Sequence, residues 1–81
     1  MRTSAQARLL HRRVLDWMEL GSYTQGCAAD AIGVSDSLIG QWVRGEQFPS
    51  VLNAALIEQD ILELKRRLLR ERGKRDLAAY Y

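Results

Sequence analysis

The stretch Tyr23–Trp42 reads YTQGCAADAIGVSDSLIGQW, and it predicts two short helices joined by a tight turn. Thr24 is a good N-cap residue at the start of the stretch, and Ser35 is a second one further along. Gly33 separates the two segments, because glycine adopts the left-handed backbone conformation without steric cost. We therefore expect one helix over about 25–32 and another that is capped by Ser35 and ends near Val43.

The residues around Gly33 indicate how these two helices pack. Ala29 lies four residues before Gly33, where a small side chain permits a close crossing. The apolar residues that are spaced to meet inside the corner are Ile32, Val34, Ile39 and Trp42. The polar or small residues left on the outer face of the second helix are Asp36, Ser37, Gly40 and Gln41. Such a corner projects one helix away from the domain, and that shape fits the major groove of DNA.

Two further helices flank the corner. Ser4 predicts the cap of a helix running to about Leu20, and Gly21 is expected to end it in the left-handed conformation. Ser50 predicts the cap of a fourth helix over about 51–72, with Gly73 as its end. Between these segments the loop 46–49 carries Phe48, which we expect to fold onto the core. No strand pattern occurs, so the predicted fold class is all-α.

The fourth helix carries a heptad pattern. Its apolar positions are spaced by three and four residues: Ala54, Ile57, Ile61, Leu64 and Leu68. We expect a helix-turn-helix domain over 1–53 and a C-terminal helix over 54–81 that joins copies of the chain, most simply as a homodimer. The seam residues of this prediction are Ile57, Ile61, Leu64 and Leu68. The alternative is that this helix folds back on the first helix as ordinary core.

The stretch resembles the helix-turn-helix of the lambda-repressor-like (Cro/Xre-type) family. The matching residues are Thr24, Gln25, Ala29, the run Ile32–Ser35, Ile39 and Trp42, and the tail WVRGEQFPS, which carries the Arg-Gly and Pro-Ser pairs of the family. The resemblance covers about 23–50, roughly a third of the chain. In size the chain is similar to a small phage or mobile-element regulator. The resemblance implies a sequence-specific DNA-binding transcriptional regulator that recognises a repeated or palindromic site.

The resemblance also assigns roles to individual residues. Thr24 and Gln25 would contact DNA phosphates at the start of the second helix, and Arg44 would contact the backbone after the third. The residues that would face base edges in the major groove are Ser35, Asp36, Ser37 and Gln41. Asp36 has a second interpretation, because a carboxylate in the first turn of a helix also stabilises the positive end of the helix dipole.

Charge is strongly segregated along the chain, whose formal net charge is +2. Residues 1–13 hold four arginines and no acid, residues 14–64 hold eight acids and only Arg44, and residues 65–81 hold seven bases and two acids. The basic ends suggest a polyanionic partner. Phosphate contacts can be added by Arg2, Arg12 and Arg13 near the start of the chain and by the basic run 65–75, KRRLLRERGKR, near its end. The alternative is that both basic segments are solvated helix faces.

Composition argues against several other classes. Cys27 is the single cysteine, so no internal disulfide is possible, and no Cys/His spacing predicts a metal site. A reducing cytoplasmic location fits best, and neither a signal peptide nor a membrane span is expected. No nucleophile–base pair or glycine-rich phosphate loop is present, so we expect neither an enzyme nor a cofactor.

Two other functions stay open at this point. The acidic middle of the chain favours a protein-interaction module, of the antitoxin or anti-repressor type, in which the corner meets a protein. A small phage DNA-packaging-type protein would bind DNA weakly through the corner and use the long helix to assemble a ring. The heptad and the polar outer face of the third helix favour the DNA-binding regulator. Repression and activation are not distinguished by the sequence.

Overall fold

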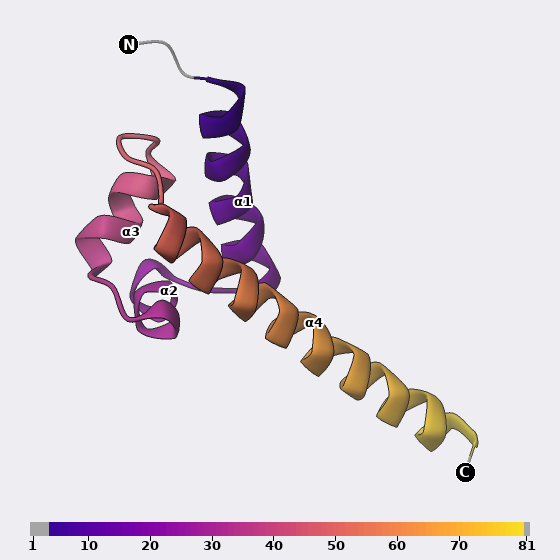
Figure 1. The fold of residues 1–81 in the computed structure, drawn as a ribbon. Helices are drawn as coiled ribbons and strands as arrows, with labels where there is room; N and C mark the ends of the chain where they lie inside the picture. Colours follow the sequence, from indigo (N-terminus) through magenta and orange to yellow (C-terminus); the bar gives the residue numbers. More distant parts are fainter. Residues whose placement is uncertain (1–3, 81) are drawn as a thin grey trace.

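The computed structural model describes residues 4–80, with side chains up to Arg72. Within this range the chain forms the expected all-α fold of four helices: α1 (Ala5–Gly21), α2 (Gln25–Ile32), α3 (Asp36–Val43) and α4 (Val51–Tyr80). Figure 1 shows α1, α2 and α3 gathered around the first half of α4, whose second half extends past them. Arg2 and the side chains of Lys74 and Arg75, to which phosphate contacts were assigned, lie outside the described residues.

The helices begin where the sequence predicts. Each N-cap hydroxyl accepts a hydrogen bond from the backbone N–H three residues later: Ser4 from Ala7, Thr24 from Cys27, Ser35 from Leu38 and Ser50 from Asn53. Each bond satisfies one of the amides that have no partner in the first turn of a helix. The four predicted helix starts are therefore confirmed by side-chain contacts as well as by the helix bounds.

Two predicted helix ends are wrong. The left-handed residue after α1 is Ser22, with φ 53°, and Gly21 stays helical. A Cβ on Gly21 would lie 2.6 Å from the Tyr23 ring, so this glycine serves a close approach of that ring. In addition, α4 continues through Gly73 to Tyr80. One interior glycine costs a helix only about 1 kcal/mol relative to alanine, and good helix formers surround this one.

One core unites all four helices. Its fully or almost fully buried members are Val14, Trp17, Ala28, Ala29, Ile39, Trp42, Ile57 and Ile61. The predicted domain boundary between residues 53 and 54 thus falls inside α4, upstream of two core residues. Phe48 does not fold onto this core as expected. It remains 36% exposed, and the next residue, Pro49, is buried instead.

A polar contact fastens α1 to α4 beside the core. The carboxylate Oδ2 of Asp60 accepts hydrogen bonds from Trp17 Nε1 at 2.8 Å and from the Tyr23 hydroxyl at 2.7 Å. The rings of Trp17 and Tyr23 meet edge to face, with centroids 5.5 Å apart. Burial, and next the hydrogen bond to Asp60, raises the pKa of Tyr23 to about 12. These contacts hold α4 in place against α1.

Candidate nucleic-acid interface

The corner between α2 and α3 forms as its glycine and alanine predict. Gly33 is left-handed, with φ 75°, and its N–H and that of Val34 both donate to the carbonyl of Ala29, at 2.8 and 3.0 Å. Ala28 and Ala29 have no exposed surface, which lets α3 cross α2 at close range. Ile39 and Trp42 fill the inner side of α3. The opposite side of α3 is therefore free of core contacts.

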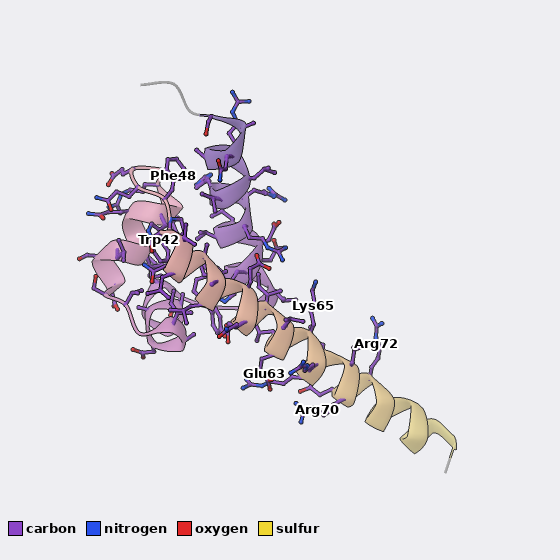
Figure 2. The ribbon with its side chains drawn as sticks, in the orientation of Figure 1. Trp42, Phe48, Glu63, Lys65, Arg70 and Arg72 are labelled. Atoms are coloured by element: carbon purple, nitrogen blue, oxygen red, sulfur yellow. The ribbon has the colours of Figure 1, made fainter. Side chains whose placement is uncertain are left out.

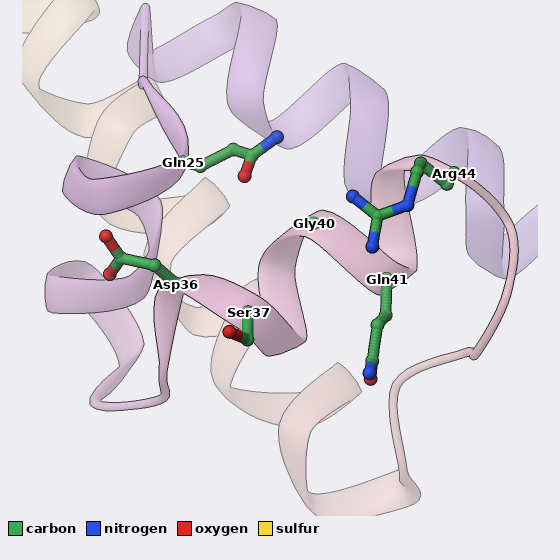
Figure 3. Close-up of a pocket in the computed structure, with 6 residues that line it drawn as sticks. All are labelled: Gln25, Asp36, Ser37, Gly40, Gln41 and Arg44. Carbon is green, nitrogen blue, oxygen red and sulfur yellow. The ribbon is translucent and has the colours of Figure 1, made fainter.

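An open hollow of about 380 Å³ lies on that outer side. Its lining residues are Gln25, Asp36, Ser37, Gly40, Gln41 and Arg44. Figure 3 shows the side chain of Gln25 reaching over from α2, while Ser37 and Gln41 extend from α3. Three of the residues predicted to face bases, Asp36, Ser37 and Gln41, thus share one surface with two of those predicted to contact phosphate, Gln25 and Arg44.

Gly40 forms the floor of the hollow rather than part of its exposed rim. It is buried, and a Cβ built on it would lie 3.0 Å from Arg44 Nη1 and 3.2 Å from Gln25 Oε1. The absence of a side chain therefore leaves room for the ends of Gln25 and Arg44 over the backbone of α3.

Arg44 is engaged by Glu46 in the loop after α3. The Nε of Arg44 donates to Oε1 at 2.9 Å, and Nη2 donates to Oε2 at 3.2 Å. This two-point hydrogen bond raises the pKa of Arg44 and lowers the pKa of Glu46. Glu46 was not among the predicted site residues, although a carboxylate two residues after an arginine is a visible signal. One edge of the guanidinium, formed by Nε and Nη2, is thus occupied, whereas Nη1 lies over Gly40.

The hydroxyls of Thr24 and Ser35 are used as caps. Each accepts the N–H of the residue three positions later, as described above, which leaves the hydroxyl hydrogen to donate to another acceptor. Both residues are exposed. They do not line the hollow, so their predicted DNA contacts would come from its margin.

Asp36 lies between the starts of two helices. It is the first residue of α3, and its Oδ2 would lie 3.4 Å from a Cβ on Gly26, near the start of α2. A carboxylate in this place interacts favourably with the positive ends of both helix dipoles. It also places negative charge where a phosphate would approach Gln25. This geometry favours an electrostatic role for Asp36 at the starts of the two helices over base contact.

Arg12 and Arg13 do not line the hollow. Arg12 pairs with Asp16 at 3.2 Å on the same helix. Arg13 holds Glu58 of α4 through Nε and Nη2, which form one edge of its guanidinium, and Nη2 donates to Oε2 at 2.6 Å. That hydrogen bond raises the pKa of Arg13 and lowers the pKa of Glu58. Arg13 thus connects α1 to α4, an arrangement that its predicted role as a phosphate contact did not include.

His11 supplies a further contact between helices that sequence reasoning missed. Its Nε2 lies 2.9 Å from the carbonyl oxygen of Val43, the last residue of α3. This carbonyl belongs to the helix end, where acceptors lack partners within the helix. The contact helps to fix the orientation of α3 relative to α1, and the two residues are 32 positions apart in the sequence.

The predicted oligomer seam needs correction. Ile57 and Ile61 are only 2% and 3% exposed, because they pack into the core of the chain itself. Leu64 is partly buried against that core, and Leu68 is 49% exposed. Two of the four seam residues are thus occupied within one chain, as the alternative of ordinary core packing implied. Any contact between copies through α4 must use residues other than Ile57 and Ile61.

Comparison with family models, curated protein sequences and solved structures finds no match to this chain. Among the described residues, no group of three or more metal-ligating side chains comes together. None of the helices in the described part of the chain combines the length and the apolar character needed to cross a membrane.

Proposed function

We propose that this chain is a sequence-specific DNA-binding transcriptional regulator of the cytosol that acts as a homodimer. In this proposal α3 enters the major groove, Gln41 and Ser37 contact base edges, and Gln25 and Arg44 contact phosphates. The observation that carries the proposal is the hollow on α3, in which five of the predicted contact residues meet on one surface. Gln41 and Ser37 extend outward from the middle of that surface.

The chemistry of these side chains is suited to the assigned roles. A glutamine amide can pair with N6 and N7 of adenine, and a serine hydroxyl accepts several base edges. Phosphate contacts fix the register of the protein on the duplex without reading sequence. A dimer would place two α3 helices in successive major grooves, about 34 Å apart.

The decisive experiment is selection of bound duplexes from a random DNA pool at near-physiological salt, followed by sequencing. We expect an enriched motif with two-fold or direct-repeat symmetry. Gln41→Ala should then relax the choice of base at one position of each half-site. Arg44→Ala should weaken binding to all sequences and reduce the salt slope by about 1, as the loss of one phosphate contact does.

These variants also define the result that would contradict the proposal. If Gln41→Ala and Arg44→Ala lowered affinity equally on every sequence, Gln41 would not be reading a base. Absence of an enriched motif, with binding that vanishes as salt rises, would leave only sequence-independent attraction to phosphate.

A second candidate, a protein-interaction module, is favoured by the acidic groups around the hollow. Asp36 lies in it, and Glu46 occupies one edge of the Arg44 guanidinium. A basic protein segment would meet complementary charge there, whereas DNA would meet two carboxylates. Failure of the DNA selection, together with binding of a basic partner that Asp36→Asn abolishes, would support this second function.

A further inference from the structure

The outward face of α4 carries a second stripe of regularly spaced residues. The stripe consists of Leu52, Ala55, Gln59, Leu62, Arg66 and Leu69, with the alternating spacing of three and four that is typical of a coiled-coil seam. An α-helix turns about 100° per residue, so this stripe lies on the side opposite Ile57 and Ile61. All six residues are exposed, and the three leucines have exposed fractions of 70%, 55% and 66% along the chain.

The exposed leucines of this stripe are costly in water. Val51, at the edge of the stripe, is 91% exposed as well. Such a row of large apolar side chains along one face of a helix is typical of an interaction surface. Leu68 is excluded from the stripe because it continues the line of Ile57, Ile61 and Leu64 on the core side. The stripe therefore indicates a partner that covers a face of α4 on which the chain has no core contacts.

The distribution of charge along α4 identifies that partner as a second copy. From Val51 to Leu64 the helix holds Glu58, Asp60 and Glu63 and no base. From Lys65 to Arg72 it holds five bases and one acid. Figure 2 shows Lys65 and Arg72 projecting from one flank of this extended half, and Glu63 and Arg70 from another. Over 51–72, α4 thus has an acidic first part and a shorter basic second part, which complement each other when two helices run in opposite directions.

The stripe is also complementary to the same stripe of a second copy when the two α4 helices run antiparallel. When Leu62 of one copy faces Gln59 of the other, Ala55 faces Arg66 and Leu52 faces Leu69. The exposed leucines at both ends of the stripe are then covered by one contact. The small Ala55 makes room for the aliphatic stem of Arg66. In the same register Lys65 of one copy approaches Glu58 of the other, which Arg13 already holds within its own chain, so this contact adds little to the preference for antiparallel pairing.

A parallel pair would be unfavourable for the same residues. It would place each Arg66 beside the Arg66 of the other copy inside the seam. It would also align the two basic halves along their whole length, and like charges that face each other in this way are destabilising. We propose that two copies of the chain dimerise through an antiparallel pairing of this outward stripe of α4. The inference rests on the proposed function only for the expectation of a dimer, and it replaces the predicted seam.

The first test measures mass without DNA. The chain has a mass of 9.2 kDa, and we expect sedimentation equilibrium to give twice that value at high concentration. Leu62→Glu should raise the dissociation constant of the dimer at least about 100-fold, because each dimer loses two buried leucines and gains two buried carboxylates. Leu68→Glu is the matched control, an exposed leucine off the stripe, and should leave the dimer intact.

The outcomes separate the two possible seams. A wild-type chain that stays monomeric up to about 1 mM would overturn the proposal. So would a Leu68→Glu variant that dissociates while Leu62→Glu does not. Circular dichroism of both variants should match that of the wild type, since both leucines are exposed in the single chain. DNA binding plays no part in these measurements, so their failure would not be confused with failure of the regulator function.

The second test determines the direction of pairing. In a Cys27→Ser background, Leu52→Cys and Leu69→Cys are prepared as separate single-cysteine chains. Antiparallel pairing brings position 52 of one copy to position 69 of the other, so a disulfide-linked dimer should form on oxidation only when the two chains are mixed. Linked dimers from either chain alone, or none from the mixture, would overturn the antiparallel arrangement.

Discussion

Arg44 and Glu46 form a two-point ion pair at the end of α3, with Nε 2.9 Å from Oε1 and Nη2 3.2 Å from Oε2. The pair lies at the rim of the hollow on α3, where the proposed function places a phosphate. A phosphate and a carboxylate compete for the same donors of a guanidinium. In the proposed complex a phosphate would therefore have to displace Glu46 from the Nε and Nη2 donors of Arg44.

Glu46→Gln should strengthen DNA binding several-fold on all sequences. The substitution removes the carboxylate that occupies Arg44 and leaves the arginine free to meet a phosphate. Binding is measured by titration of fluorescent duplexes at several salt concentrations. Glu19→Gln is the control, since it removes one exposed negative charge from α1, away from the hollow. A loss of affinity in Glu46→Gln would mean that Glu46 orients Arg44 for binding instead of competing with DNA.

Asp36→Asn should lower stability and raise DNA affinity together. The carboxylate interacts with the positive ends of two helix dipoles, so its removal should cost about 0.3–1 kcal/mol of unfolding free energy. The same removal takes a negative charge from the hollow, and affinity should rise for every sequence. Asp30→Asn makes the same charge change on α2, outside the hollow, and serves as the control. A change of preference at a single base position would show instead that Asp36 reads a base.

Tyr23→Phe should lower the free energy of unfolding at neutral pH. It should also remove part of the decrease in that free energy that the wild type shows at alkaline pH. The variant loses the hydroxyl that donates to Asp60, at a cost of about 1–2 kcal/mol. The folded chain holds the pKa of Tyr23 at about 12, above its ordinary value of 10.0. The folded state thus keeps a proton that the unfolded state releases. The contribution of the Tyr23 hydroxyl to the free energy of unfolding is therefore complete below pH 10 and is lost as pH rises toward 12.

Chemical denaturation of both proteins from pH 8 to 12 measures this effect. Other groups titrate in the same range, and subtraction of the variant curve from the wild-type curve removes their contribution. The difference in unfolding free energy should be constant below about pH 10 and shrink above it. A difference that stays constant over the whole range would show that Tyr23 has an ordinary pKa.

The sequence predicted those features that depend on neighbouring residues. The caps of Ser4, Thr24, Ser35 and Ser50 each act over three positions, and the turn at Gly33 needs only the backbone freedom of glycine. These signals place α2 and α3 correctly and, with them, the residues of the hollow. The helix end predicted at Gly21 is wrong because, in the sequence alone, a glycine that makes room for a ring looks the same as a glycine that ends a helix.

The missed features join residues that are far apart in the chain. Trp17 and Asp60 are 43 positions apart, and Arg13 and Glu58 are 45 apart. Their pairing depends on how α1 crosses α4, which no local pattern specifies. The same crossing decides which of the two apolar stripes of α4 is buried. The sequence showed a heptad in Ile57, Ile61, Leu64 and Leu68, but only the packed structure shows that the first two belong to the core.

Gly40→Ala should have opposite effects on stability and on binding. Alanine in place of an interior helix glycine stabilises by about 0.5–1 kcal/mol. The added Cβ would lie 3.0 Å from Arg44 Nη1 and 3.2 Å from Gln25 Oε1, so both flexible ends must move by a few tenths of an ångström or more. We expect thermal unfolding at a higher temperature and weaker DNA binding, because the two proposed phosphate contacts are pushed apart.

Gly26→Ala provides the matched control for this substitution. Its Cβ would meet only Asp36 Oδ2, at an ordinary distance of 3.4 Å, so the gain in helix stability comes without crowding in the hollow. Gly26→Ala should therefore stabilise α2 and leave DNA affinity near that of the wild type. Should Gly40→Ala bind DNA as well as Gly26→Ala does, the ends of Gln25 and Arg44 above Gly40 would have no part in binding, and the phosphate contacts would have to come from elsewhere on the chain.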